Sequence, residues 1–164
     1  MNANGSDQHR LATYRAASPN GGGGPTWSPG GQKIAFPAAF PRADRIVLVN
    51  ANGARPRRLT RNPYGSETAY EYDPAWSPDG SKIAFTADSG EGGTTWIDVI
   101  NADGSRQRQL TNLKRDGLCE NDSKPAWAPS GRKIAFARAS ENGDDERLYI
   151  MNGDGREQHA LSHG

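Results

Sequence analysis

Short stretches of alternating apolar and polar residues recur along the chain, separated by turns rich in Gly, Pro, Asn and Asp. The clearest stretches share the sequence Lys-Ile-Ala-Phe, at 33–36, 82–85 and 133–136. Alternation with a period of two places the Ile and the Phe on one face of a β-strand. A second apolar run follows each of them, at 46–49, 96–100 and 148–151. The pattern therefore predicts an all-β fold of short antiparallel strands joined by hairpins.

These strands belong to three copies of one repeat. Each copy opens with a Pro-x-Trp-x-Pro-x-Gly segment, at 25–31, 74–80 and 125–131. Each then passes through an Asn-x-x-Gly turn into a polar outer strand that closes on Leu59, Leu110 or Leu161. A period of about 50 residues is typical of propellers and solenoids. We therefore expect each copy to form one sheet of four antiparallel strands.

The N-terminal residues look like the end of a further repeat, because 1–11 align with 49–59 and both stretches close on a leucine. We predict an outer strand of a preceding blade and a Gly-rich loop within 1–24. The rest of the chain is then divided into three blades and two connecting loops, at 25–60, 61–73, 74–111, 112–124 and 125–164.

The repeat closely resembles the blade of TolB-like β-propellers, the PD40 or WD40-like class. The resemblance covers residues 1–13 and 25–162, and it is carried by Trp-Ser-Pro-Asp-Gly, Lys-Ile-Ala-Phe, Asn-Ala-Asp-Gly and Gln-Leu-Thr. The first copy has Gly30 in place of Asp, and the third has Ala128 and Ser130, which affects only turns. The resemblance implies blades packed radially around a central channel, with the first strand of each blade innermost.

Six aromatic residues are expected to fill the spaces between blades: Trp27, Trp76, Trp127, Phe36, Phe85 and Phe136. Propellers close with four to eight blades, so three blades leave two apolar faces exposed to water. Burying one large aromatic side chain is worth roughly 1.5–3 kcal/mol. We therefore expect a homodimer, in which two arcs join head-to-tail into the six-bladed ring that the resemblance implies. A larger ring or an open arc would also fit the sequence.

Charge and hydropathy exclude some classes of function. The chain has 20 basic and 19 acidic residues, a net charge of +1, whereas a dedicated nucleic-acid-binding protein needs a concentrated basic face. No apolar run is long enough for a transmembrane helix. The N-terminus does not read as a signal peptide, so the chain as written is expected to be cytoplasmic, although a TolB-like parent protein could be periplasmic.

Few residues suggest catalysis or metal binding. The chain contains neither a Gly-x-Ser-x-Gly nucleophile motif nor a phosphate-binding loop. His159 and His163 lie four residues apart on a predicted strand and tail, where that spacing does not bring two ligands together. His9 occupies the position equivalent to His159, and Cys119 has no partner cysteine. We expect no catalytic residue, metal or cofactor.

The sequence therefore predicts a non-catalytic propeller that acts as a protein-binding or assembly scaffold. The resemblance implies that a protein or peptide partner binds at the channel mouth. The most distinctive residues of the loops expected there are Tyr64, Tyr70, Tyr72 and Asp73, and tyrosine is favoured at interfaces.

Two other interpretations stay open. In the first, the chain is the propeller part of a TolB-like enzyme, either a serine peptidase cap or a metal-dependent polysaccharide lyase, without its catalytic residues. In the second, it is a half-propeller that self-assembles and has no ligand.

Overall fold

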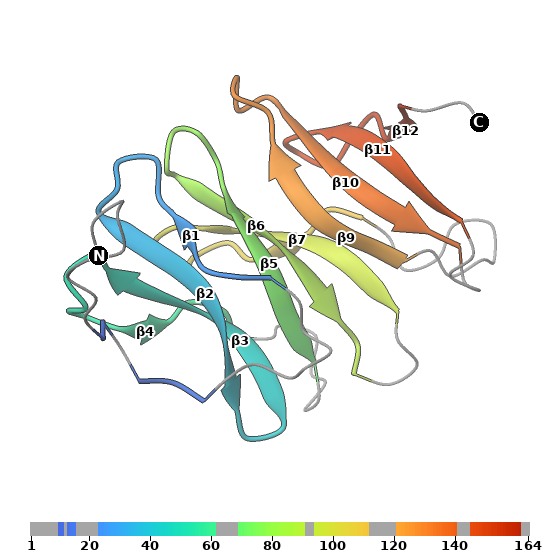
Figure 1. Cartoon of the computed structure of the whole chain (residues 1–164). Coiled ribbons are helices and arrows are strands. Elements are labelled where there is room, and N and C mark those ends of the chain that lie inside the picture. Colours follow the sequence, from blue (N-terminus) through green and yellow to red (C-terminus); the bar gives the residue numbers. More distant parts are fainter. Residues whose placement is uncertain are drawn as a thin grey trace, which may run out of the picture.

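The computed structural model describes residues 10–11, 13–15, 23–61, 69–90, 94–111, 121–140 and 145–161. In this described part the chain forms strands and turns and no helix (Figure 1). The strands make three antiparallel sheets of four, one for each repeat, which confirms the all-β prediction. In every sheet the strands follow one another in chain order.

Each sheet consists of a first strand, two longer central strands and a short outer strand. Sheet 1 contains β1 (Thr26–Trp27), β2 (Lys33–Phe40), β3 (Ala43–Asn50) and β4 (Arg57–Arg58). Sheet 2 contains β5 (Tyr70–Trp76), β6 (Lys82–Asp88), β7 (Thr95–Asn101) and β8 (Arg108–Gln109). Sheet 3 contains β9 (Asn121–Trp127), β10 (Lys133–Ala139), β11 (Glu146–Asn152) and β12 (His159–Ala160).

The first strands of sheets 2 and 3 begin earlier than the sequence pattern suggested. Strand β5 starts at Tyr70 and β9 at Asn121, inside the segments 61–73 and 112–124 that we had assigned to connecting loops. The two added stretches are rich in polar residues, and in each strand a bulge before the proline interrupts the two-residue period that would connect the stretch with the following Trp motif.

The bulge of β5 lies at Asp73, where the pairing register with β6 shifts between Tyr72 and Ala75. Asp73 has a left-handed backbone with φ of 51°, a conformation that aspartate tolerates better than most residues. Because the bulge shifts the alternation, Glu71 before it and Trp76 after it both face sheet 1. Lys124 in β9 has φ of 54°, at the equivalent position directly before a proline.

The turn between the first two strands is fixed by its own atoms. In sheet 2 the Gly80 N–H donates to the Ser77 carbonyl over 2.8 Å, and Gly80 has φ of 69°. The Ser77 hydroxyl oxygen accepts a bond of 2.9 Å from the Lys82 N–H. Hydrogen bonds from Ser77 and Ser81 lower the pKa of the Asp79 carboxyl to about 2. The four-residue turn predicted from Ser-Pro-Asp-Gly is therefore present.

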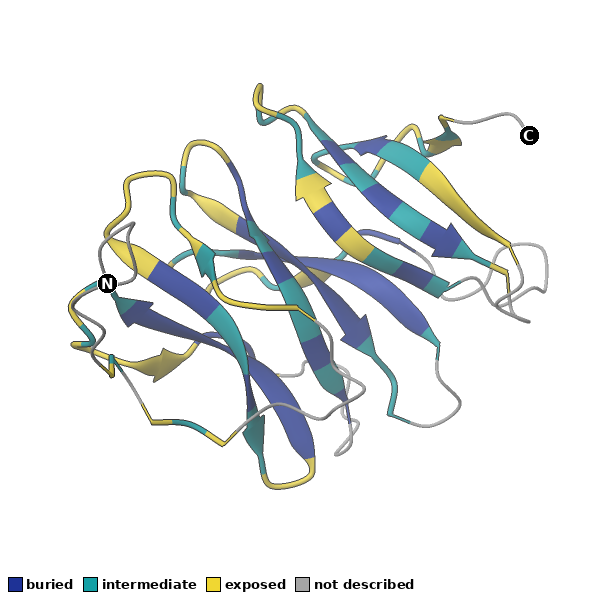
Figure 2. Cartoon of the chain, viewed as in Figure 1, coloured by how far each residue is buried: buried dark blue, intermediate teal, exposed yellow. Residues whose placement is uncertain are grey.

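Two apolar seams hold the sheets together, and Figure 2 shows that most of the buried residues lie on the central strands. The main buried residues between sheets 1 and 2 are Ile46, Leu48, Leu59, Trp76, Ile83, Phe85, Trp96 and Ile100. Those between sheets 2 and 3 are Ala84, Ile97, Val99, Leu110, Ile134, Phe136 and Met151, with Trp127 and Tyr149 packed against them. The central strands thus supply nearly all of the core.

The three repeat tryptophans differ in their surroundings. Trp76 is 8% exposed within the first seam, and Trp127 is half-buried against the second. Trp27 is 56% exposed, because no complete sheet among the described residues covers the face of sheet 1 that carries it. Among the equivalent phenylalanines, Phe85 and Phe136 are buried and Phe36 is half-buried.

A buried carboxyl joins sheets 1 and 2. Glu71 is 2% exposed and accepts hydrogen bonds from the Thr60 hydroxyl and, over 3.3 Å, from the Ile46 N–H. Burial raises the pKa of Glu71 from 4.5 to about 7, while the bond from Thr60 and the nearby charge of Arg45 oppose the rise. The carboxyl is therefore held by neutral donors and is easily protonated.

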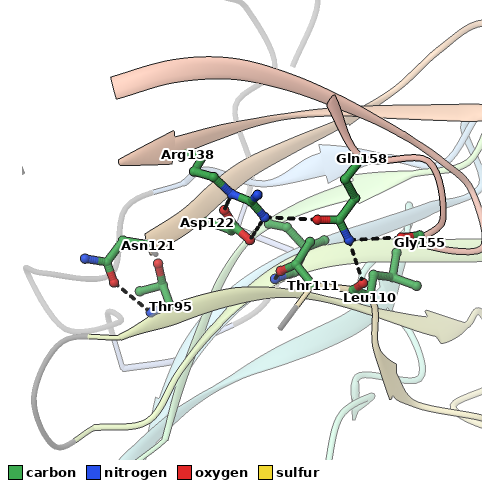
Figure 3. A network of polar contacts seen from close by, with 9 residues as sticks. Thr95, Leu110, Thr111, Asn121, Asp122, Arg138, Gly155 and Gln158 are labelled. Carbon is green, nitrogen blue, oxygen red and sulfur yellow. Dashed lines mark hydrogen bonds and ion pairs between the residues drawn. The ribbon is translucent and has the colours of Figure 1, made fainter. Parts of the chain in front are cut away.

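The equivalent acid between sheets 2 and 3 is ion-paired instead (Figure 3). Asp122 is fully buried and accepts two bonds from Arg138, of 2.6 and 2.9 Å. Arg138 also donates to the Gln158 side chain over 3.0 Å and lies 4.6 Å from the Tyr149 ring centre. Gln158 in turn donates to the Leu110 carbonyl of sheet 2 over 3.3 Å. A buried charge of this kind is tolerable only when it is fully paired.

Replacing Trp76 by Ala should destabilise the protein by about 3–5 kcal/mol, because it empties the centre of the first seam. Replacing Trp27 by Ala is the matched control and should cost less than about 1 kcal/mol, since this side chain is largely exposed. Chemical denaturation of dilute protein, followed by circular dichroism, measures both. Equal losses for the two variants would contradict the seam as described.

Glu71→Gln should remove a pH dependence of stability. Because the folded pKa lies above the unfolded value, the stability that protonation of Glu71 provides is fully present below pH about 4.5. It is lost as the pH rises to about 7. At about pH 8 the variant should exceed the original chain in unfolding free energy by on the order of 3 kcal/mol, and this difference should shrink towards about pH 5.

Denaturation at a series of pH values measures this difference between the two chains. Glu146→Gln, at a carboxyl whose side chain is 52% exposed, is the control and should leave the pH profile unchanged. If the unfolding free energies of Glu71→Gln and of the original chain differ by the same amount across this pH range, Glu71 is not the group whose raised pKa makes stability depend on pH.

Candidate functional site

The first strands of the three sheets lie side by side. Strand β5 packs against both β1 and β9, and each of the three is the edge strand of its own sheet. They therefore line one common side of the row of sheets, which we call the inner side. The predicted binding residues Tyr70, Tyr72 and Asp73 all lie on β5. The fourth, Tyr64, lies outside the described residues.

Both tyrosines of β5 face sheet 3. Tyr70 is paired opposite Asp88, and Tyr72 opposite Thr86, and directly opposed residues project from the same face of a sheet. The Thr86 hydroxyl accepts a hydrogen bond of 3.2 Å from the Lys124 N–H of β9, which places this face against sheet 3.

The structure thus assembles what we call the inner-strand cluster: Tyr70, Tyr72, Asp73, Asp88 and Lys124. The first four are half-buried and Lys124 is exposed. Sequence reasoning missed Asp88 and Lys124. The sequence did contain a signal for Lys124, because this residue precedes the recurring repeat position Pro125 just as Asp73 precedes Pro74 in the second repeat. Asp88 had none, since it lies at the end of a strand next to a Gly-rich loop.

The cluster shifts the ionisation of its own members. Burial raises the pKa of Tyr72 to about 12, and the negative charges of Asp88 and Asp73 add to the rise. Burial also raises the pKa of Asp73, against the attraction of Lys124. The pKa of Asp88 is raised by burial too, while its bond of 2.5 Å from the Gly90 N–H opposes the shift. The phenol therefore stays protonated at neutral pH and is available as a hydrogen-bond donor.

Two contacts shape the rim of the cluster. Gly23 lies so close to Asp73 that a side chain at residue 23 would collide with it, and its φ of 95° also favours glycine. On the other side, Lys124 forms an ion pair of 3.0 Å with Glu146, and both side chains are more than half exposed. An exposed pair of this kind is worth little, so the ammonium can exchange Glu146 for a ligand carboxylate.

The cluster has the composition of a binding surface. It offers two aromatic rings, two carboxylates and one exchangeable ammonium, which together suit peptide groups and side chains of both charges. Among the described residues, no group of three His, Cys, Asp or Glu side chains could hold a metal ion. His159 is exposed on β12, where its Nδ1 lies 2.9 Å from the Glu157 carbonyl. His9, His163 and Cys119 lie outside the described residues.

No helix that could cross a membrane is found in the part of the chain that the structure describes.

Solved structures with this fold include proteins with and without enzymatic activity. A protein of Agrobacterium tumefaciens assigned to TolB superposes with a TM-score of 0.67 and 22% identity, over 84% of this chain and 45% of that one. A puromycin-hydrolysing peptidase of Mycobacterium tuberculosis superposes with a TM-score of 0.65 and 22% identity, over 88% of this chain and 23% of the peptidase. An oligogalacturonate lyase in complex with manganese superposes with a TM-score of 0.62 and 23% identity, over 85% of this chain and 36% of the lyase.

The chain thus spans less than half the length of each of these proteins, and at such identities the likeness concerns the fold alone. The sequence itself also matches a family model, that of the TolB beta propeller domain, over residues 8–164. This match includes all three repeats and the stretch before the first. The chain therefore belongs to the PD40 family, the TolB beta propeller domain.

Proposed function

We propose that this propeller domain is a non-catalytic scaffold that binds a protein or peptide partner on its inner side and associates with a second copy of itself. The observation that carries the first half is the inner-strand cluster. Tyr70 and Tyr72 are half-buried aromatic side chains on an edge strand, and charged groups of both signs surround them.

This arrangement suits a peptide better than a small metabolite. Half-buried tyrosines provide rigid contact area at a low cost in side-chain entropy, which makes them frequent in protein-binding surfaces. Asp73 and Asp88 can accept hydrogen bonds from peptide N–H groups or basic side chains. Lys124 can pair with a carboxylate, since its present partner is exposed.

Self-association is supported by the two ends of the row of sheets. At one end Trp27 is 56% exposed, and at the other Leu148 and Leu161 are each 49% exposed. Figure 2 shows the contrast between the buried strands β3 and β7 and strand β11, whose first part, residues 146–148, is exposed. Two copies joined head-to-tail supply six sheets, a number within the range in which propellers close.

The alternative is that the domain belongs to an enzyme, as do the propellers of the peptidase and the lyase that share its fold. The proposal of a non-catalytic role rests on the sequence, which has no Gly-x-Ser-x-Gly nucleophile motif. It also rests on the chemistry of the inner-strand cluster, in which, among the described residues, no Ser, Cys or His side chain is found that could act as a nucleophile or as its base.

Replacing Tyr70 and Tyr72 together by Ala should weaken peptide binding at least tenfold, because aromatic anchors carry much of the energy of such interfaces. The probe is a displayed library of random peptides, selected on the immobilised original chain and then measured one by one by fluorescence polarisation. Arg108→Ala removes an exposed side chain on the outer strand β8, away from the inner-strand cluster, and should leave these affinities unchanged. Peptides that bind the double variant as tightly as the original chain would contradict the assignment of this surface.

Titration with manganese chloride or zinc chloride, followed by calorimetry, should show no saturable binding at micromolar concentrations. The reason is that the inner-strand cluster offers carboxylates without an imidazole or a third acidic ligand, which is too few for a tight site. The chain is first treated with a chelator and dialysed. Saturable binding of one ion per chain would favour the lyase-like alternative.

A further inference from the structure

A crevice of about 200 Å³ opens where β10 ends and β11 begins. It is lined by Arg138, Ala139, Ser140, Asp145, Arg147 and Tyr149. Arg138 is buried and Tyr149 is half-buried, whereas the side chains of Asp145 and Arg147 are more than half exposed. The crevice therefore has a buried side made of a guanidinium and an aromatic ring, and an exposed side made of an ion pair.

The two guanidinium groups of the crevice are neutralised in different ways. Arg138 and Arg147 are paired directly opposite each other on β10 and β11, a position in which like charges repel. Arg138 is held within the fold by two bonds to the buried Asp122 (Figure 3). Arg147 is neutralised by Asp145, because its Nε and one Nη donate to one carboxylate oxygen over 3.0 and 2.6 Å. Displacement of Asp145 would thus leave the crevice with one uncompensated positive charge.

The repeat position of Arg147 is filled differently in the other two sheets. Strand pairing makes Arg147 equivalent to Arg45 in sheet 1 and to Trp96 in sheet 2. Arg45 is buried and donates to two backbone carbonyls, and Trp96 is buried and donates to Asp98 over 2.9 Å. Packing accounts for these two side chains but not for Arg147, whose side chain is 56% exposed. The third repeat therefore presents a cation to solvent at a position that the others use for the core.

Two consecutive acidic residues of the chain itself occupy two exposed cations. Asp145 pairs with Arg147, and Glu146 pairs with Lys124 of the inner-strand cluster over 3.0 Å. All four side chains are more than half exposed, and exposed ion pairs contribute little to stability. Both cations are therefore available to other carboxylates that approach from solvent.

We propose that Lys124 and Arg147, which we call the cation pair, bind two consecutive carboxylates of an acidic peptide segment, and that Asp145 and Glu146 occupy the cation pair until this segment displaces them. The inference rests on the peptide binding proposed above and specifies the chemistry of the partner. Two consecutive residues of this chain satisfy both cations, so two consecutive acidic residues of a ligand can do the same. With a net charge of +1, the chain as a whole attracts acidic peptides only weakly, so this binding depends on the local arrangement.

Displacement of the two internal carboxylates leaves the backbone in place. The Ser140 N–H donates to the Asp145 carbonyl over 3.2 Å, and Glu146 is paired opposite Ala139. Only the side chains of Asp145 and Glu146 have to rotate, and their carboxylates then return to water. The incoming carboxylates gain charge-assisted hydrogen bonds, from the planar fork of Arg147 and from the ammonium of Lys124.

Fluorescence polarisation at low ionic strength tests this with fluorescein-labelled hexaglutamate, whose ends are acetylated and amidated. Asp145→Asn with Glu146→Gln should tighten its binding about fivefold, because the internal competitors are removed. Lys124→Gln with Arg147→Gln should weaken it about tenfold, because the charge-assisted bonds are lost. Circular dichroism and cooperative denaturation establish that each variant is folded.

Charge-matched variants separate the cation pair from a change in overall charge. Asp154→Asn with Glu157→Gln removes two exposed acids beyond the other end of β11, and Arg108→Gln with Arg156→Gln removes two exposed bases away from the crevice. Both should leave the affinity for hexaglutamate within about twofold of the original chain, since distant exposed charges are screened. Responses as large as those of the crevice variants would overturn the proposal. Lack of saturable binding to the Asp145→Asn, Glu146→Gln variant would overturn it too.

The peptides selected on the original chain keep this test distinct from that of the proposed function. If those peptides depend on Tyr70 and Tyr72 while hexaglutamate does not respond to changes in the cation pair, peptide binding stands and the acidic partner is overturned. If hexaglutamate responds as expected while the selected peptides ignore both tyrosines, the aromatic part of the surface is wrong and the cation pair stands.

Discussion

A four-stranded sheet with two half-apolar faces cannot bury both of them by itself, and this constraint determines the organisation of the whole molecule. Sheet 2 satisfies it completely, because sheet 1 covers one face and sheet 3 the other. Trp76 and Phe85 on one face and Ile97 on the other are accordingly almost inaccessible to water. Among the described residues, sheets 1 and 3 each have a neighbouring sheet on one face only. The stability of each sheet is therefore tied to its neighbours, as in other repeat proteins.

The repeat made most of this arrangement predictable. Alternation in Lys-Ile-Ala-Phe identified the central strands, and the glycines of the turns identified the hairpins, because both depend on local backbone and side-chain geometry. The start of β5 could not be predicted, since the bulge at Asp73 shifts the alternation of Tyr70–Tyr72 out of phase with that of Ala75–Trp76. The difference in exposure between Trp27 and Trp76 could not be predicted either, because the two sequence motifs are nearly identical. Burial depends instead on which sheet lies opposite each tryptophan.

The candidate site was only partly visible in the sequence for a related reason. Tyr70, Tyr72 and Asp73 are neighbours along the chain and stood out as a group. Asp88 and Lys124 join them through strand pairing and through the packing of one sheet on the next, which sequence spacing does not reveal. The two seams also differ at one position of the repeat, which the sequence did not reveal. Glu71 in the first seam is held by neutral donors, whereas Asp122 in the second is held by Arg138.

Every strand pairs with the strand that precedes or follows it in the chain. Contacts within a sheet therefore span few residues, and loop closure costs little entropy. The contacts between sheets span about one repeat and need both partners already formed. Hairpins should consequently form early during folding and the seams late. A growing chain would then complete its blades one after another, each serving as the template on which the next one condenses.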